Sequence, residues 1–439
     1  MNGPLLSWGR LPNHPQTGLP VHWQDEAPDA LRRLAGAHGS TLAYGNGRSY
    51  GDSCLAASDR VLCLRPLDRL LAADWQAGRI RIEAGATVEE VIAIALPRGW
   101  FLPVTPGTKF VTLGGCLAND VHGKNHHRRG TFGRHVSRFA LLRSDRGLLE
   151  CAPAENGELY AATIGGLGLT GIVLWLELQL LPVRSSRIRI VSTRFESLEE
   201  FSALSEELDH RHEYSVAWID CQSGNRALGR GIFTVGDHVE DGPLRVSKPR
   251  SLAVPITPSF SLVNAWTIAA FNTLYFHRQR PRALESEVDY DGYFYPLDGI
   301  LEWNRIYGRR GFQQFQCVVP EAAGMAAIGA MLTAIAQSGL GSFLAVLKRC
   351  GDASSPGLIS FPMRGPTLAV DVPQDEPRVA PLFQRLDAIL REAGGRLYPA
   401  KDAHMSPLDF KAAYPAWERL EGLRDPQLLS RFWMRVTRQ

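Results

Sequence analysis

The stretch LGGCLANDVHGKNHH, residues 113–127, points to the architecture of this chain more directly than any other segment. Small residues fill its first half, where they allow the backbone to approach a flat cofactor closely. Its second half places three histidines, a lysine and an asparagine within six residues. A zinc site is the obvious alternative, but no Asp, Glu or Cys stands at the spacing of a tetrahedral site, and Lys124 would repel a cation. We therefore expect a cofactor pocket here and no metal.

Two glycine-rich loops lie on either side of this segment in the sequence. Residues 44–52, YGNGRSYGD, suit a tight loop whose N–H groups face one point and bind phosphate oxygens, with Arg48 and Ser49 adding a charge and a hydroxyl. A plain glycine turn is the alternative, because short glycine motifs often occur by chance. Residues 164–171, IGGLGLTG, precede a strand, but no strand–loop–helix unit of about 30 residues surrounds them. That context disfavours a Rossmann site.

Length and composition limit the class of protein. The 439 residues are too many for one ordinary core, so two domains are expected, and 45% hydrophobic with 21% charged residues is typical of a folded soluble protein. The net charge of +3 gives no electrostatic argument for binding nucleic acid. The seven cysteines are scattered and form no C-x-x-C pair, which argues against a disulfide framework and suits a reducing compartment. We therefore expect a cytoplasmic protein.

The relation to membranes depends on one apolar stretch. Residues 1–24 show no apolar core of a signal peptide, and no run reaches the roughly 18 to 20 apolar residues that span a bilayer. The longest apolar run, residues 251–274, is interrupted by two prolines and by Ser, Thr and Asn. It predicts a loop entering an amphipathic or a membrane-surface helix, with a buried core helix as the alternative. Peripheral contact with the inner face of the plasma membrane is the resulting hypothesis.

Short strands and helices are predicted along the whole chain. Thr87 and Glu90 form a capping box at the start of a helix over residues 87–96, which Pro97 ends. From residue 187 onward two strand–helix units follow one another, which indicates an α+β fold with an antiparallel sheet backed by helices and no internal repeat. The expected strands are 61–64, 80–84, 169–183, 188–191, 315–319, 343–347 and 368–372, and the expected helices after residue 187 are 197–208, 321–338 and 379–393.

Taken together, these motifs resemble the FAD-linked oxidases of the vanillyl-alcohol oxidase type, the superfamily with a PCMH-type FAD-binding fold. Within it, the likeness is greatest to the decaprenylphosphoryl-ribose oxidase branch. The resemblance covers residues 8–435 and is most specific in the HGKNHH block. It rests on the motifs GNGRSYGD (45–52), TPGT (105–108), LGGCLANDVHGKNHH (113–127), GTFG (130–133), IGGLGLTGI (164–172), LDG (297–299), WNRIYG (303–308), QFQ (314–316), FLAVLK (343–348), SFP (360–362), VD (370–371) and GGRLYPAKD (394–402).

The resemblance implies a two-domain fold with a split cofactor domain. Residues 1–186 would form the PCMH-type FAD-binding domain, and residues 187–395 would form a substrate-binding cap with an antiparallel sheet. Residues 396–439 would return to the FAD domain. The family oxidises CH–OH groups with FAD, so the chain is expected to be an FAD-dependent oxidoreductase.

The resemblance further implies a substrate and a partner. The expected reaction oxidises a sugar hydroxyl to a ketone, at C2 of a lipid-linked, polyprenyl-phosphoryl ribose-like sugar, as the first half of an epimerisation in cell-wall polysaccharide biosynthesis. A separate NAD(P)H-dependent short-chain reductase would complete the epimerisation. Two alternatives stay open: an aldonolactone or alditol oxidase that passes electrons from a free sugar to O2, and a flavin-binding protein without catalysis. The intact segment 398–401 argues against the second alternative.

Residue roles follow from matching motif to motif. Lys401, with His122 and Tyr50, is expected at the reacting carbon, where a desolvated lysine either accepts the hydroxyl proton or stabilises the alkoxide. A surface lysine is the alternative for Lys401. The residues expected to bind the cofactor are Gly45, Asn46, Gly47, Arg48, Ser49, Tyr50, Thr108, Gly114, Gly115, Asn119, His122, Gly123, Ile172 and Tyr398. The residues expected to contact substrate are Lys124, Tyr307, Gln314, Gln316, Lys348 and Lys401, with Tyr50, His122 and Tyr398 beside them.

Two positions depart from the family pattern. Several relatives tether FAD covalently through a histidine in the first glycine loop, whereas this chain has Arg48 there, so FAD is expected to bind non-covalently. The mycobacterial relatives carry a cysteine just before the Val-Asp pair, whereas this chain has Ala369. The expected chemistry does not use that thiol, but susceptibility to thiol-directed inhibitors does depend on it.

Overall fold

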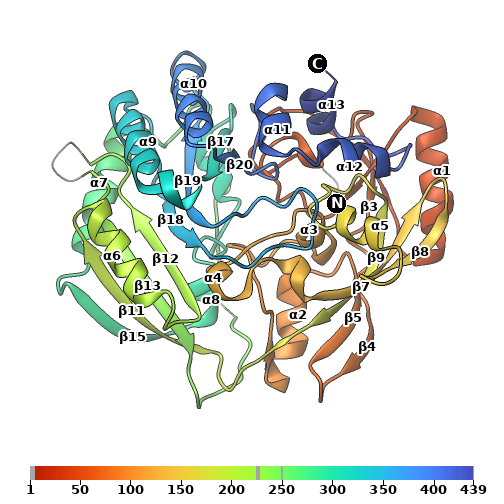
Figure 1. The fold of residues 1–439 in the computed structure, drawn as a ribbon, viewed down its shortest axis with the longest axis horizontal. Coiled ribbons are helices and arrows are strands. Elements are labelled where there is room, and N and C mark those ends of the chain that lie inside the picture. The colour runs from red at the N-terminus through yellow and green to blue at the C-terminus, as the bar shows by residue number, and fades with distance from the viewer. Residues whose placement is uncertain (1–4, 224–227, 249–250, 439) are drawn as a thin grey trace.

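The computed structural model describes residues 5–223, 228–248 and 251–438 (Figure 1). Two large sheets organise this part of the chain. One has five strands from residues 70–179, and the other has eight strands from residues 187–397. Neighbouring strands pair antiparallel throughout both sheets. The predicted α+β class is confirmed.

The N-terminal part of the chain combines the five-stranded sheet with a small parallel sheet. Its elements are β1 (Thr17–Pro20), α1 (Ala27–His38), β2 (Leu42–Tyr44), β3 (Arg60–Cys63), β4 (Leu70–Asp74), β5 (Arg79–Glu83), α2 (Val88–Ala95), β6 (Trp100–Phe101), α3 (Leu113–Ala118), α4 (His126–Arg129), β7 (Val136–Arg143), β8 (Gly147–Cys151), α5 (Gly157–Thr163), β9 (Ile172–Gln179) and β10 (Leu181–Pro182). The small sheet has the order β1-β3-β2, and the large one β4-β5-β9-β7-β8. Ile82, Val91, Phe139 and Leu176 share one core between the large sheet and α2.

The second part of the chain is built around the eight-stranded sheet, in the order β15-β11-β13-β12-β18-β19-β17-β20. Its elements are β11 (Arg187–Phe195), α6 (Leu198–Leu208), β12 (Tyr214–Ile219), β13 (Gly231–His238), β14 (Leu252–Ala253), α7 (Ala265–His277), β15 (Ala283–Asp289), α8 (Tyr290–Phe294), β16 (Ile300–Leu301), β17 (Phe312–Val318), α9 (Gly324–Ser338), β18 (Ala345–Cys350), β19 (Gly365–Pro373), α10 (Glu376–Glu392), β20 (Arg396–Leu397), α11 (Pro407–Ala413), α12 (Trp417–Leu423) and α13 (Arg431–Thr437). Phe201 of α6, Met331 of α9 and Leu386 of α10 pack in one core with Phe315 of β17. These three helices therefore cover one face of the sheet (Figure 1).

The eight-stranded sheet contains a repeat that the sequence does not reveal. A strand–helix–strand–strand unit, β11-α6-β12-β13, is followed by a second unit, β17-α9-β18-β19. In each unit the third strand lies between the other two, and the units join through the antiparallel pair of β12 and β18. The expectation of no internal repeat is therefore wrong at the level of topology. The two units can share the same order of strands and helix without having the same side chains.

Local signals predicted several elements well. Thr87 caps α2, accepting a hydrogen bond from the N–H of Glu90 at 3.3 Å and donating its own N–H to the Glu90 carboxylate at 2.8 Å, which confirms the capping box. The predicted helix over residues 197–208 is confirmed, with Ser197 as its cap. The long strand expected over residues 169–183 is shorter, because residues 169–171 belong to a glycine loop in which Gly168 has a φ of +74°.

The apolar run after residue 251 forms a short strand, a loop and then α7. The strand β14 pairs with β16, and Asn264 caps α7 through the N–H groups of Trp266 and Thr267. The expectation of an amphipathic helix is wrong. Ile268 and Phe276 are buried against the sheet, while Trp266 and Leu274 on other faces are exposed, so the helix is apolar nearly all round. Among the described residues, no helix is both long and apolar enough to cross a bilayer.

The end of the chain returns to the N-terminal part, where the blue helices α11, α12 and α13 lie beside the red and orange elements (Figure 1). The strand β20 first adds to the edge of the eight-stranded sheet beside β17. Backbone hydrogen bonds then tie the returning segment to the first glycine loops, from Tyr50 N–H to the Ala400 carbonyl at 2.9 Å and from Ala57 N–H to the Leu429 carbonyl at 2.9 Å.

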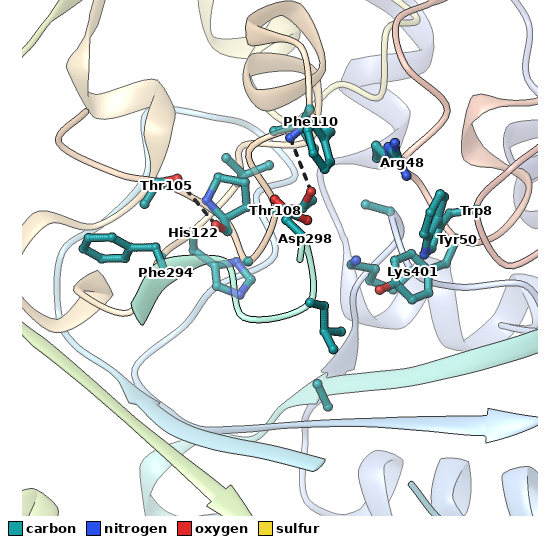
Figure 2. Close-up of a pocket in the computed structure, with 18 of the residues that line it drawn as sticks. Trp8, Arg48, Tyr50, Thr105, Thr108, Phe110, His122, Phe294, Asp298 and Lys401 are labelled. Atoms are coloured by element: carbon teal, nitrogen blue, oxygen red, sulfur yellow. Dashed lines mark hydrogen bonds between the residues drawn. The ribbon is translucent and has the colours of Figure 1, made fainter. Parts of the chain in front are cut away.

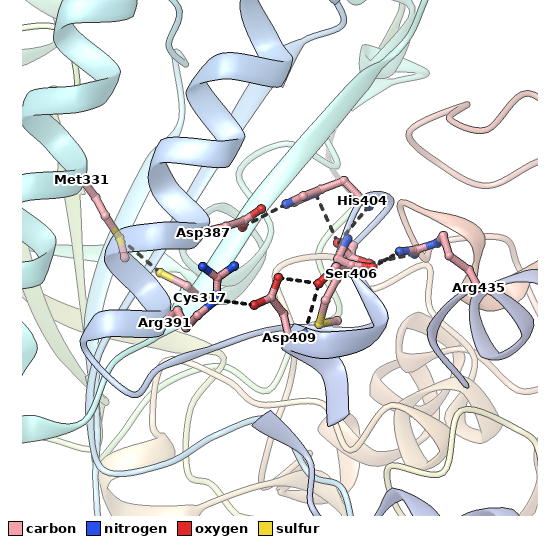
Figure 3. A network of polar contacts seen from close by, with 10 residues as sticks. Cys317, Met331, Asp387, Arg391, His404, Ser406, Asp409 and Arg435 are labelled. Carbon is pink, nitrogen blue, oxygen red and sulfur yellow. Dashed lines mark hydrogen bonds and ion pairs between the residues drawn. The ribbon is translucent and has the colours of Figure 1, made fainter. Parts of the chain in front are cut away.

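A polar network fixes this return. The Arg435 guanidinium donates to both carboxylate oxygens of Asp52, at 2.9 and 2.8 Å, and to Asp402 at 2.8 Å. His404 lies between Asp402 and Asp387 of α10, at 3.3 and 3.2 Å (Figure 3). Burial opposes protonation of His404, but the hydrogen bond to Asp387 and the charge of Asp402 raise its pKa above the ordinary value. Arg435 and His404 together hold the pKa of the buried Asp402 below its ordinary value, against the effect of burial.

Arg435→Ala should destabilise the fold strongly. The change removes the arginine that pairs with both Asp52 and Asp402, whose side chains are 6% and 1% exposed, and leaves His404 as the cationic neighbour of Asp402. Breaking such a buried pair costs about 3 to 5 kcal/mol, to be measured as the free energy of unfolding in urea. Arg431→Ala is the matched control on the same helix, because its partner Asp59 is 37% exposed and the loss should stay below about 1 kcal/mol. Equal losses in the two variants would contradict this assignment.

Candidate active site

A cavity of about 930 Å³ lies between the glycine loops of the N-terminal part and the eight-stranded sheet. The loops at residues 45–50, 105–108 and 121–124 form one wall, and strands β12, β17, β18 and β19 contribute to the other. Figure 2 shows Arg48, Tyr50, His122, Asp298 and Lys401 converging on this space. Its size lies at the upper end of the range for small-molecule and cofactor sites.

The first glycine loop follows β2 and is held by contacts to its neighbours. Gly47 has a φ of +62°, in the left-handed region that favours glycine. Asn46 donates its side-chain amide to the Phe110 carbonyl at 2.8 Å. The Arg48 guanidinium lies between two aromatic rings, 4.1 Å from the centre of Trp8 and 5.4 Å from the centre of Phe110. Burial lowers the pKa of Arg48, against the raising effect of Asp298 and Glu302.

Helix α3 contributes a second group of small residues to the lining of the cavity. Thr112 caps this helix by accepting from the N–H of Gly115 at 3.2 Å, and Asn119 donates to the Gly115 carbonyl at 2.9 Å. Gly107 and Gly168 both line the cavity, and a Cβ at either would meet no atom within 4 Å. Their backbones therefore face open space. Such a cradle fits a long, flat dinucleotide such as FAD, which needs close approach of the backbone along its length.

His122 lies deep in the cavity wall. Its Nε2 is 3.2 Å from the side-chain amide nitrogen of Gln316, and its ring lies 5.4 Å from the rings of Phe361 and Tyr398. Its Nδ1 is buried and has no hydrogen-bond partner within the described parts of the chain. Burial, followed by the charge of Lys348, lowers its pKa well below the ordinary value. The imidazole is therefore neutral and can serve as a hydrogen-bonding group.

Two lysines lie at this end of the cavity, where Lys348 is buried and Lys124 is partly buried. Lys348 of β18 donates to the Gly123 carbonyl at 2.8 Å. Lys124 donates to the Tyr293 carbonyl, and its Nζ lies 4.1 Å from the centre of the Tyr293 ring. Burial lowers the pKa of Lys348 to about 8, and burial together with the charge of Lys348 lowers that of Lys124 to about 7. An anionic group between them would restore their charge and be held by it.

Lys401 and Tyr50 meet at another part of the wall. The Lys401 Nζ lies 3.5 Å from the centre of the Tyr50 ring (Figure 2). Burial lowers the pKa of Lys401 to about 7, against the raising effect of Asp371. An amine in this state can take up a proton near neutral pH, as a general base must.

Most of the residues predicted for the site line the cavity. Ile172 and Tyr307 do not, because Ile172 is buried in the core beneath β9 and Tyr307 stacks on Phe312 with ring centres 4.3 Å apart. Asp298, which also lines the cavity, had no predicted role, although its LDG motif was recognised. The residues that line the cavity as predicted are Gly45, Asn46, Gly47, Arg48, Ser49, Tyr50, Thr108, Gly114, Gly115, Asn119, His122, Gly123, Lys124, Gln314, Gln316, Lys348, Tyr398 and Lys401.

Comparison with known proteins identifies the family. The FAD binding domain family matches residues 21–152. The decaprenylphosphoryl-β-D-ribose oxidase of Mycolicibacterium smegmatis is 32% identical over 437 residues, covering 96% of this chain and 94% of the relative. The chain belongs to the decaprenylphosphoryl-β-D-ribose oxidase family. An uncharacterized protein of Streptomyces coelicolor is 32% identical over 352 residues, 77% of this chain and 95% of its own. The mouse L-gulonolactone oxidase is 25% identical over 176 residues, 39% of each chain.

Membership in this family confirms the predicted superfamily, cofactor and class of enzyme. The chain is an FAD-dependent oxidoreductase with a PCMH-type FAD-binding fold. The glycine cradle described above fits this cofactor, and the loop at residues 45–50 and helix α3 are the parts of the chain that would hold it.

Acid precipitation should release the FAD from the purified protein. Arg48 occupies the loop position at which several relatives carry a tethering histidine, and a guanidinium stays protonated and forms no such bond. The measurement is flavin absorbance in the supernatant and in the washed pellet. Flavin that stays with the precipitated chain would show that another residue forms a covalent link.

Proposed function

We propose that this enzyme oxidises the C2 hydroxyl of a polyprenyl-phosphoryl ribose-like sugar to a ketone, as the first half of an epimerisation. The observation that carries the proposal is the extent of the match to the mycobacterial oxidase, which includes the substrate-facing strands as well as the FAD domain. A likeness over a third of the chain, as with the human Δ24-sterol reductase at 33% of this chain, would leave the substrate open.

The proposed function assigns a task to each part of the chain. Residues 1–186 form the FAD-binding domain, residues 187–395 form the substrate-binding cap, and residues 396–439 return to complete the cofactor site. The position of the cavity between the glycine loops and the eight-stranded sheet supports this division, as does the hydrogen bond between Tyr50 and Ala400.

The residues of the cavity divide the work between them. When bound, FAD supplies the acceptor for the hydride that leaves the sugar carbon. Lys401 accepts or shares the hydroxyl proton, and Tyr50 and the neutral His122 orient the sugar beside it. Gln314 and Gln316 offer amides to the remaining hydroxyls, and Lys124 and Lys348 bind the phosphate of the substrate. The loop from Gly45 to Ser49 holds the cofactor pyrophosphate, as do Gly114 and Gly115.

The lipid tail of the substrate leaves the cavity over an exposed apolar surface. Ala253, Ile300 and Leu301 line the cavity, and near them in the chain Leu252 is 74%, Trp266 87% and Leu274 73% exposed. Exposed His277 ends α7, and the exposed Arg278 and Arg280 come directly after it. Apolar anchors beside basic side chains suit an anionic lipid surface, so the enzyme docks on the inner face of the plasma membrane without spanning it.

A separate NAD(P)H-dependent short-chain reductase completes the epimerisation. The ketone must be reduced by a hydride donor, and the sequence contains no strand–loop–helix unit with the glycine pattern of a nicotinamide site. The FAD of this chain would accept hydride in the oxidation, so a separate protein would have to donate hydride in the reduction.

A polyprenyl-phosphoryl ribose should bleach the bound FAD under anaerobic conditions, whereas free alditols and aldonolactones should not. The reason is that a free sugar has neither a phosphate to bind Lys124 and Lys348 nor a lipid tail to contact the apolar surface. The product should remain a ketone when NADH is added to the purified chain. Faster bleaching by a free alditol, or epimerisation with NADH alone, would contradict the proposal.

Lys401→Ala should retain FAD and reduce it at least about 100-fold more slowly in a single turnover, since general acid–base groups contribute on the order of 10² to 10⁴ in rate. Lys401→Arg should also be slow, because a guanidinium cannot act as a base. Stopped-flow bleaching measures both variants. A rate near that of the wild type in Lys401→Ala would move the role to His122 or Tyr50.

The purified enzyme should float with anionic lipid vesicles in a density gradient. Leu274→Ser should weaken this binding about tenfold, because one leucine side chain contributes about 1.5 to 3 kcal/mol when it enters an apolar phase. The matched control is Leu408→Ser on α11, since both leucines are 73% exposed. Equal flotation of the two variants, or no flotation of the wild type, would exclude docking through α7.

A further inference from the structure

The loop after helix α3 contains a fully buried carboxylate that the function proposed above does not use. Asp120 Oδ1 accepts a hydrogen bond from the N–H of Gly133 at 2.9 Å, and Oδ2 accepts from the hydroxyl groups of both Ser355 and Ser360. Burial raises the pKa of the Asp120 carboxyl above its ordinary value, and the hydrogen bonds from the two serines act to lower it. A carboxylate is costly to bury, so these donors hold it in a defined position.

The two serines bring the second part of the chain to this carboxylate. Both belong to the loop between β18 and β19 of the eight-stranded sheet, whereas Asp120 belongs to the N-terminal part. Their places in the loop differ. Ser355 also accepts the N–H of Gly357 at 2.9 Å and so stabilises the turn at residues 355–357. Ser360 directly precedes Phe361, so its hydrogen bond to Asp120 fixes the position of that aromatic residue.

Phe361 extends this contact to the active site. Its side chain is 1% exposed and shares a small core with Tyr398. The Phe361 ring stacks on the Tyr398 ring with centres 4.6 Å apart, and its centre lies 5.4 Å from that of the His122 ring. Arg396 holds the Phe361 carbonyl with a hydrogen bond of 2.8 Å. The backbone of Phe361 is therefore held by Arg396 at its own carbonyl and by Ser360 on the preceding residue.

The imidazole of His122 depends on this packing for its orientation. Its backbone is held by a bridge to Thr131. Within the described parts of the chain, its ring has one hydrogen bond, to Gln316 at 3.2 Å, and its Nδ1 has no partner. One hydrogen bond fixes one atom of the ring. The plane of the ring is set by the neighbouring rings of Phe361 and Tyr398, each 5.4 Å away between centres.

We propose that Asp120 is a positioning residue for His122. Through the hydrogen bond from Ser360 it holds the Phe361 ring against the imidazole, and so keeps the imidazole in its place in the cavity wall (Figure 2). This inference rests on the proposed oxidation, in which His122 orients the sugar. Asp120 exchanges no proton in that reaction and acts only through the packing of these residues.

The first measurement follows the His122 ring in the FAD-bound enzyme and needs no substrate. In protein made with ¹³C-labelled histidine, the Cε1–H signal of His122 is identified by NMR through its loss in His122→Gln. The signal reports the position of the flanking rings, because an aromatic ring shifts the resonances of nuclei close to it. Ser360→Ala should therefore shift or broaden the His122 signal. Asp120→Ala should move it at least as far, and if that variant does not fold, Ser360→Ala carries the test alone.

Ser355→Ala is the matched control. It removes a hydroxyl group from the same oxygen of Asp120, but Ser355 lies in the turn at residues 355–357 and not beside Phe361. Each serine variant loses one hydrogen bond to the same buried carboxylate, so a general loss of stability would appear in both. Only Ser360→Ala should move the His122 signal. An unmoved signal in Ser360→Ala, or equal shifts in the two variants, overturns the proposal.

Flavin bleaching then tests the consequence for the reaction. Ser360→Ala should slow single-turnover bleaching about 10-fold, because displacement of a group by about 1 Å can cost up to about 10²-fold in rate. Substrate affinity should stay near that of the wild type, since Lys124 and Lys348 still bind the phosphate. Ser355→Ala should keep the wild-type rate. A moved His122 signal with an unchanged rate would also overturn the proposal.

The two measurements separate this inference from the function on which it rests. A polyprenyl-phosphoryl sugar that bleaches no wild-type flavin would refute the proposed function. The NMR signals would still decide whether Asp120 and Ser360 place His122, because they are recorded without substrate.

Discussion

The close approach of the first glycine loop to the returning C-terminal segment is the constraint on which the site depends. A Cβ at Gly51 would lie 1.6 Å from the carbonyl oxygen of Asp402, so only glycine allows this contact. Tyr50 N–H donates to the Ala400 carbonyl beside it. Segments about 350 positions apart in the sequence are joined at this point, and the join brings Lys401 over the Tyr50 ring. Gly51 therefore contributes to the geometry of the site only by allowing this close packing.

Burial of lysines is the second feature that gives the cavity its chemistry. Lys348 is buried and Lys124 and Lys401 are partly buried, and burial lowers the pKa of each to between about 7 and 8. Their neighbours differ, and this difference separates their roles. Lys348 and Lys124 donate to the backbone carbonyls of Gly123 and Tyr293, which suits an incoming anion, whereas Lys401 lies over the Tyr50 ring, which suits exchange of a proton.

The features that the sequence predicts correctly are those that depend on residues close together in the chain. The cap of α2 was predicted because Thr87 and Glu90 are three residues apart, and the glycine loops because their backbone needs are local. Asp371 received no role, although its Val-Asp motif was recognised. Its hydrogen bond with Gln314 depends on the pairing of β17 with β19, which no local pattern reveals. The contact of the Tyr307 ring with Phe312 is likewise a tertiary contact that no local pattern reveals.

The pairing of β17, β18 and β19 places Ala369 at the wall of the cavity. Ala369 pairs with Gln316 and Val346, and all three line the cavity. The neighbouring pair, Cys317 and Leu368, faces the opposite side, where both are fully buried in the core beneath α9. The Cys317 thiol is therefore screened from the cavity, and burial raises its pKa to about 12. A ligand that needs a thiolate at this wall finds the methyl group of Ala369 there.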